Sequence, residues 1–106
     1  MLTKPARILC IGKDFSLLRS RVAVLTNAGY DSQAAMLHEA EGILRIQDFY
    51  LIILSASVSD KEGDYITNLI GDRAPILKLR EFTIVSDLLA MVGRIIAEVS
   101  QLQRSA

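Results

Sequence analysis

Phe49-Tyr50-Leu51-Ile52-Ile53-Leu54 is the stretch of sequence that determines the fold. It carries no charged residue and is too short and too uniformly apolar for a surface helix. A run of this kind is typical of a strand that is buried on both faces. Such strands belong to parallel sheets that helices cover on both sides, so the segment predicts a central strand in an α/β fold.

Apolar runs and amphipathic stretches alternate along the rest of the chain. The predicted strands cover residues 7–12, 30–34, 49–54 and 75–79. The predicted helices cover residues 17–27, 36–46, 63–70 and 86–103. This order predicts a three-layer α-β-α sandwich around a parallel sheet of four strands, or of five if a further strand fits between Leu79 and Ser86.

The first predicted helix has a well-defined apolar stripe. The stripe runs through Leu18 and Leu25, which places Arg19 and Arg21 on the solvent side of the helix. Gly29 follows as a helix stop, because glycine readily adopts the left-handed conformation that ends many helices.

The composition fits a single domain over residues 1–106. The chain is 51% hydrophobic and 23% charged, which excludes a disordered tail. Twelve basic residues balance twelve acidic ones, so no basic excess is present to drive binding to nucleic acid.

The start of the chain lacks a signal-peptide pattern and no apolar run could span a bilayer, so we expect a cytoplasmic protein without membrane contact. The lone cysteine, Cys10, excludes an internal disulfide and a multi-cysteine zinc site.

Several segments match one known family in order and spacing. They are residues 8–18, 27–30, 50–54, 63 and 75–77. In that order they resemble parts of the receiver domain of response regulators: the first strand with its following loop, the A-G-Y motif, the third strand, the glycine before the third helix, and the fourth strand. The resemblance covers most of the chain, from residue 6 to about residue 103. It implies the flavodoxin-like receiver topology, with the region of the fourth helix shortened.

The positions that carry the chemistry of that family differ in this chain. A receiver has a pair of acids after its first strand to bind Mg²⁺, whereas Gly12 and Lys13 stand there and only the neighbouring Asp14 is acidic. The phosphoacceptor Asp ends the third strand of a receiver, and Ser55 stands at that position. The Thr or Ser at the end of the fourth strand corresponds to Arg80.

The assignment of residues 75–79 has an alternative. If this segment is the fourth strand of the family, the later Lys-Pro pair of receivers is not found in the chain. If the segment takes the place of the fifth strand, Glu81 and Phe82 fall where the Lys-Pro pair would be.

These departures predict a degenerate pocket without aspartyl phosphorylation. Mg²⁺ prefers carboxylate and phosphate oxygens. Lys13 instead puts a cation where the metal would sit, paired with Asp14 or with a carboxylate of the 55–63 loop, unless it is a solvated loop lysine. Ser55 is a poor phosphoacceptor without a base or a metal beside it. We therefore expect no metal, no cofactor and no catalytic residue.

Apolar residues wrap more than one face of the last predicted helix. A surface helix needs only one apolar stripe, so the excess predicts a second buried face. That face either closes the core of the chain itself or forms an interface with another protein, together with an unpaired edge strand. The candidate interface residues are Leu88, Val92, Ile95, Ile96, Val99 and Leu102.

Together these features predict a signal-transduction module that acts through protein contacts, independently of phosphorylation. We expect it to form a homodimer through its C-terminal helix. We do not expect an enzyme, because one histidine and one cysteine are too few for a nucleophilic catalytic set. The alternative is a domain that senses a small ligand or nucleotide with the loops at residues 12–16 and 55–63.

Overall fold

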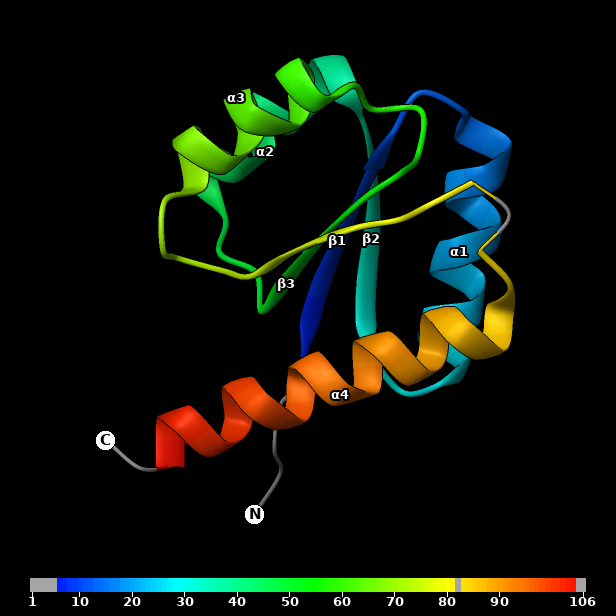
Figure 1. Cartoon of the computed structure of the whole chain (residues 1–106), viewed down its shortest axis with the longest axis vertical. Helices are drawn as coiled ribbons and strands as arrows, with labels where there is room; N and C mark the ends of the chain where they lie inside the picture. Colours follow the sequence, from blue (N-terminus) through cyan, green and yellow to red (C-terminus); the bar gives the residue numbers. More distant parts are fainter. Residues whose placement is uncertain (1–5, 82, 105–106) are drawn as a thin grey trace.

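Strands and helices alternate along the chain, as the sequence predicts (Figure 1). The computed structural model describes residues 6–81 and 83–104, with side chains as far as residue 101. The strands are β1 (Arg7–Gly12), β2 (Asp31–Met36), β3 (Leu51–Leu54) and β4 (Ile76–Lys78). The helices are α1 (Phe15–Asn27), α2 (Leu37–Ile46), α3 (Asp60–Ile70) and α4 (Val85–Arg104).

Within the described residues, the strands form one parallel sheet in the order β2-β1-β3-β4. β1 lies between β2 and β3, with Leu9 opposite Gln33 on one side and Ile52 on the other. β3 is also internal, which confirms the central strand predicted from its uniform apolar sequence. The order is that of a flavodoxin-like sheet, 2-1-3-4-5, of which residues 6–81 and 83–104 form the first four strands. The prediction of a three-layer α/β sandwich is therefore confirmed, with four strands in the described part of the chain.

β4 holds the place of the fourth strand in this order. It follows α3 in the chain and pairs with β3, with Leu77 opposite Ile53. Arg80 therefore follows the fourth strand, and residues 75–79 do not take the place of a fifth strand. Phe82, which the alternative assignment invoked, lies outside the described residues.

Helices cover both faces of the sheet and create two cores (Figure 1). Alternate side chains of β1 and β3 enter each core, because successive residues of a strand point to opposite faces. The core under α2 and α3 receives Leu9, Ile11, Ile52 and Leu54. The core under α1 and α4 receives Ile8, Cys10, Leu51 and Ile53. Burial on both faces is the physical reason that these strands carry uninterrupted apolar runs.

Several elements begin one to three residues away from their predicted starts, among them α1 at Phe15, two residues early. The starts of α3 and β3 show the contacts that sequence patterns miss. α3 begins at Asp60, three residues early, because Ser59 and Glu62 form a capping box. In this box the Ser59 hydroxyl accepts from the backbone N–H of Glu62 at 3.2 Å, and the Glu62 carboxylate accepts from the backbone N–H of Ser59 at 2.9 Å. β3 begins only at Leu51, and Phe49 before it packs in the core outside the ladder.

α4 packs on the same core as α1 and runs back against the direction of β4 (Figure 1). Its 20 residues span roughly 30 Å, whereas the three residues of β4 span roughly 10 Å, so the helix outruns the strand. Leu88 and Val92 in its first half are 4% and 0% exposed and lie in that core. Among the described residues, α4 included, no helix is both long enough and apolar enough to cross a membrane.

The predicted interface residues therefore divide into groups. Leu88 and Val92 are part of the chain's own core, where a second protein cannot reach them. Ile95 and Ile96 are half-buried and pack against the same core, and Val99 is half-buried as well. The side chain of Leu102 lies outside the described residues.

Candidate functional site

Three of the predicted site residues meet where the strands of the sheet end. The carboxyl ends of parallel strands form the edge at which ligands bind in open α/β sheets. Gly12 ends β1, and Ser55 follows β3 directly. The backbone N–H of Ser55 donates to the carbonyl of Ile11 at 2.9 Å, which extends the β1–β3 ladder to this point. Arg80 comes two residues after β4 at the same edge.

Gly12 and Ser55 are packed so closely that position 12 has no room for a side chain. A Cβ atom at this position would lie 2.5 Å from Ser55 Oγ and 2.9 Å from Ser55 Cβ. It would also lie 3.3 Å from Cδ2 of Leu18. Gly12 is thus required by the close approach of β3. A carboxylate cannot stand at the end of β1 while Ser55 keeps this position.

Ser55 is a buried polar residue held by an arginine. It is 3% exposed, and its Oγ accepts a hydrogen bond of 2.5 Å from Nη1 of Arg21. The prediction that Arg21 lies on the solvent side of α1 is wrong. Arg21 is three residues after Leu18 and four before Leu25, and this spacing puts all three on one face. Arg19, in contrast, is exposed as predicted.

Arg21 is a half-buried cation without a direct ion pair. Among the described residues, no carboxylate oxygen lies within 4.0 Å of its guanidinium. Removal from water lowers the pKa of Arg21, while Cys10 and Asp14 act in the opposite direction. Burial raises the pKa of the Cys10 thiol to about 12, which the nearby Arg21 charge opposes. Cys10 is therefore an un-ionised core residue, and Arg21 brings positive charge into the end of the sheet.

Lys13 is paired with a carboxylate from α3. Its Nζ lies 2.8 Å from Oε1 of Glu62, the same oxygen that accepts from the backbone of Ser59. The hydrogen bond from Lys13, followed by those from Ser59, lowers the pKa of Glu62 to about 2. Of the two partners that the sequence left open for Lys13, the structure has the carboxylate after β3. Asp14 caps the first turn of α1 instead.

Lys78, at the end of β4, hydrogen-bonds to the turn that follows β3. Its Nζ donates to the backbone carbonyl of Ser55 at 3.0 Å and also to that of Val58. The backbone N–H of Val58 donates to the carbonyl of Ser55 at 3.1 Å and closes the turn. Ser55 therefore has a cation on its side chain and another on its backbone.

A cavity of about 450 Å³ opens between these groups. Charged groups of both signs line it, and a turn of small residues forms one wall. The lining residues include Asp14, Arg21, Ser55, Ser57, Arg80 and Glu81. Such a lining suits a small polar molecule better than a bare cation or an apolar ligand.

The residues at this edge do not fit Mg²⁺. This ion takes an octahedron of oxygen ligands, mostly carboxylate, phosphate and water oxygens. Arg21 and Lys78 place positive groups on Ser55, Lys13 adds another beside Gly12, and Asp14 is engaged in the helix cap. Over residues 6–81 and 83–101, no three His, Cys, Asp or Glu side chains gather into a set that could hold a metal.

Three residues of this site are absent from the sequence prediction. The spacing of Arg21 relative to the apolar stripe of α1 is a signal that could have found it. The pattern from Ser59 to Glu62 is the signature of a capping box, which would have placed Glu62 in the first turn of α3. Lys78 has no such signal, because its contacts depend on β4 lying next to β3.

The comparisons with known proteins show the fold. No protein-family model matches the sequence, and no curated protein sequence matches it either. A response regulator receiver domain protein, CheY-like, from Methanospirillum hungatei has a similar structure, with a TM-score of 0.68, 17% identity, and coverage of 92% of this chain and 98% of that one. The signal receiver domain of a Vibrio parahaemolyticus protein described as a Luxo repressor is similar with a TM-score of 0.71, 16% identity, and coverage of 95% and 97%. The chain thus has a response-regulator receiver-like fold.

Proposed function

We propose that this receiver-like domain is a signal-transduction module that acts through protein contacts and is not phosphorylated on an aspartate. The observation that carries the proposal is the hydrogen bond from Arg21 to Ser55 at the end of β3. It sets a cation against Ser55, the residue that the resemblance puts where a receiver has its phosphoacceptor Asp. We place the module in the cytoplasm and propose that it works by binding rather than by catalysis.

Electrostatics supports this proposal. Phosphoryl transfer depends on a metal ion that neutralises the charge developing on the phosphoryl oxygens. The ammonium of Lys13 is committed to Glu62, and position 12 cannot accept an acid. The Ser55 hydroxyl is buried and accepts from a cation. Among the described residues, no carboxylate or imidazole hydrogen-bonds to it as a base would.

Intact-mass measurement after incubation with acetyl phosphate and Mg²⁺ tests this part of the proposal. We expect no gain of a phosphoryl group, because β3 is followed by Ser55 and not by an aspartate, and the described residues hold no metal-binding set. A receiver domain that has all its acidic residues, treated in parallel, is the positive control. A phosphoryl adduct on any aspartate of this chain would contradict the proposal.

We also propose that the domain self-associates through α4. Three observations support this: half-buried Ile95, Ile96 and Val99 extend along its second half, the helix outruns the sheet, and β4 is an edge strand. Native mass by light scattering over a dilution series tests it. A dimer that dissociates on dilution is the expected result, and a monomer at every concentration would contradict it.

A second candidate function is the binding of a small polar ligand. The cavity of about 450 Å³ beside Arg21 and Ser55 favours it, since ligands of open α/β sheets bind at this edge. A molecule that binds only the folded chain raises its melting temperature. Thermal shifts with inorganic phosphate and with AMP test this candidate, using Arg21→Met as the variant that should lose any shift. No shift with either probe would count against phosphate-bearing ligands.

A further inference from the structure

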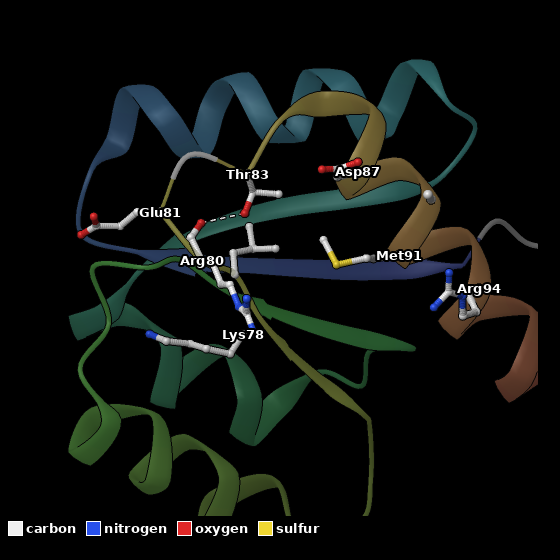
Figure 2. A pocket seen from close by; sticks show the side chains of 9 residues that line it. Lys78, Arg80, Glu81, Thr83, Asp87, Met91 and Arg94 are labelled. Atoms are coloured by element: carbon white, nitrogen blue, oxygen red, sulfur yellow. Dashed lines mark hydrogen bonds between the residues drawn. The ribbon is translucent and has the colours of Figure 1, made fainter.

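A groove of about 540 Å³ runs between the segment that follows β4 and the outer side of α4 (Figure 2). The strand side of the groove is formed by Lys78, Leu79, Arg80 and Glu81, and the helix side by Asp87, Ala90, Met91 and Arg94. Figure 2 shows Met91 and Arg94 extending from α4 toward the strand side. Met91 lines the groove and also packs against the core under α1 and α4.

The strand that borders this groove has an unpaired edge. The backbone groups of Pro75 and Leu79 hydrogen-bond to β3. Since alternate residues of a strand direct their N–H and C=O groups to opposite sides, those of Ile76 and Lys78 point away from β3. No other strand of the described residues pairs with β4 on that side. Free edge groups of this kind readily pair with another chain.

The helix side of the groove is self-complementary in charge. Asp87, Ala90, Met91 and Arg94 share one face of α4, because they are spaced by three or four residues. Asp87, Ala90 and Arg94 are exposed, and Met91 is half-buried. Asp87 and Arg94 stand about 10 Å apart along the helix, too far to pair with each other. Neither has an ion-pair partner among the residues that the structure describes.

We infer that this groove is the contact surface between two copies of the chain, related by a two-fold axis that sets their α4 helices antiparallel. With the axis between Ala90 and Met91, Asp87 of each copy faces Arg94 of the other, and the methyl group of Ala90 leaves room for the longer Met91. The same axis turns the two β4 strands antiparallel, with their free edges toward each other. A partner of different sequence would not require opposite charges at the two ends of the stripe.

This inference rests on the proposed self-association and gives it a surface. It moves the contact away from the core-facing side of α4, where Leu88 and Val92 lie, to the side that borders the groove. The apolar pair in the middle would be desolvated on association, and the two symmetry-related ion pairs would fix the register.

Charge reversal tests the arrangement. The dissociation constant is measured by light scattering over a dilution series for the natural chain, Asp87→Arg, Arg94→Asp and the double variant. Each single reversal makes like charges face each other twice, so we expect the dissociation constant to rise by about tenfold or more. The double variant restores opposite charges, so its dissociation constant should return to that of the natural chain.

Lys61→Glu and Asp64→Arg are the matched controls, because they reverse exposed charges on α3, which packs on the other face of the sheet. Circular dichroism melts confirm that each variant folds. If the natural chain dimerises but the single reversals change nothing, or the double variant fails to recover, the α4 arrangement is overturned and self-association stands. If the natural chain is a monomer throughout, the proposed self-association itself fails.

Discussion

At the scale of single residues, the contact between Gly12 and Ser55 determines what the ends of β1 and β3 can hold. The hydroxyl and Cβ of Ser55 occupy the space that any side chain at position 12 would need. The buried hydroxyl in turn fixes the guanidinium of Arg21. One glycine thus sets the position of a serine, and the serine sets the position of a cation.

A double-mutant cycle measures this contact. Gly12→Ala forces a Cβ against Ser55, and we expect a loss of about 1–3 kcal/mol in the free energy of unfolding, as for other overpacked cores. Ser55→Gly removes the opposing atoms, so adding Gly12→Ala to it should cost much less. Urea denaturation of the four chains gives the coupling energy, and a coupling near zero would show that β1 and β3 separate freely.

Gly42→Ala is the matched control for that cycle. Gly42 is exposed on α2, and a Cβ there would meet nothing within 4 Å. Alanine favours helix over glycine, so we expect the same substitution at this position to stabilise the chain by about 0.5–1 kcal/mol.

Only some residues of the candidate site can be predicted from the sequence. Gly12, Lys13 and Ser55 could be identified because the resemblance to receivers supplies their positions. The sequence misplaces Arg21, because a charged residue beside an apolar stripe is expected to face solvent. A half-buried cation on a helix needs an acceptor from another element, and the sequence does not reveal that the acceptor is Ser55.

At the scale of secondary-structure elements, the start of α3 connects the helix to the site. The capping box places Glu62 in the first turn, where its carboxylate reaches both the backbone of Ser59 and the ammonium of Lys13. The loop after β1 is therefore fastened to α3 by the same side chain that begins the helix.

Ser59→Ala tests the contribution of this cap. Loss of the hydroxyl leaves the N–H of Glu62 without its acceptor, and we expect the free energy of unfolding to fall by about 1 kcal/mol. Ser57→Ala, in the exposed part of the same turn, is the control and should change it by less than about 0.5 kcal/mol. Equal effects in urea denaturation would argue that the box does not stabilise α3.

The type and order of the elements follow from the sequence, whereas their ends do not. Apolar runs identify β1, β3 and β4, helical spacing identifies the four helices of the described chain, and β2 is a weaker strand signal of mixed polarity between two of them. The start of α3 depends on a side-chain cap, and the start of β3 depends on where its pairing with β1 begins, at Leu51 opposite Ile8. Both are decided by contacts that apolar periodicity does not record.

At the scale of the whole molecule, stability should fall at both ends of the pH range. Glu62 has a pKa of about 2 in the folded chain and an ordinary value of 4.5, so its contribution is complete above pH 4.5 and is lost as the pH falls toward 2. The thiol of Cys10 has a pKa of about 12 in the folded chain and an ordinary value of 9.0. The unfolded chain ionises first, so stability falls as the pH rises from 9 toward 12.

Urea midpoints measured across pH check both limbs. Lys13→Met removes the main cause of the low Glu62 pKa and should flatten the acid limb. Cys10→Ala should flatten the alkaline limb, whatever it does to stability at neutral pH. If the urea midpoints of these variants fall with pH as steeply as those of the natural chain, groups other than Glu62 and Cys10 cause the pH dependence.

The sequence predicts the order and packing of the strands and helices, but it does not predict the grooves on the surface. Alternation of strands and helices leaves few topologies, and the parallel sheet is one of them. The groove beside β4 could not be foreseen, since it exists only because the chain passes from the fourth strand straight to a helix on the α1 side. The apolar excess of α4 predicted a second buried face, and the structure places Leu88 and Val92 of that face within the chain's own core.

The tight packing of Gly12 against Ser55 also restricts how this sequence can change over generations. A mutational path toward a phosphorylatable pocket would need carboxylates at both strand ends. If position 12 changes first, the new side chain collides with Ser55. If position 55 changes first, the introduced carboxylate pairs with the guanidinium of Arg21, and its Cβ still blocks position 12. Neither single step puts carboxylates at both strand ends, so the two positions constrain each other's change.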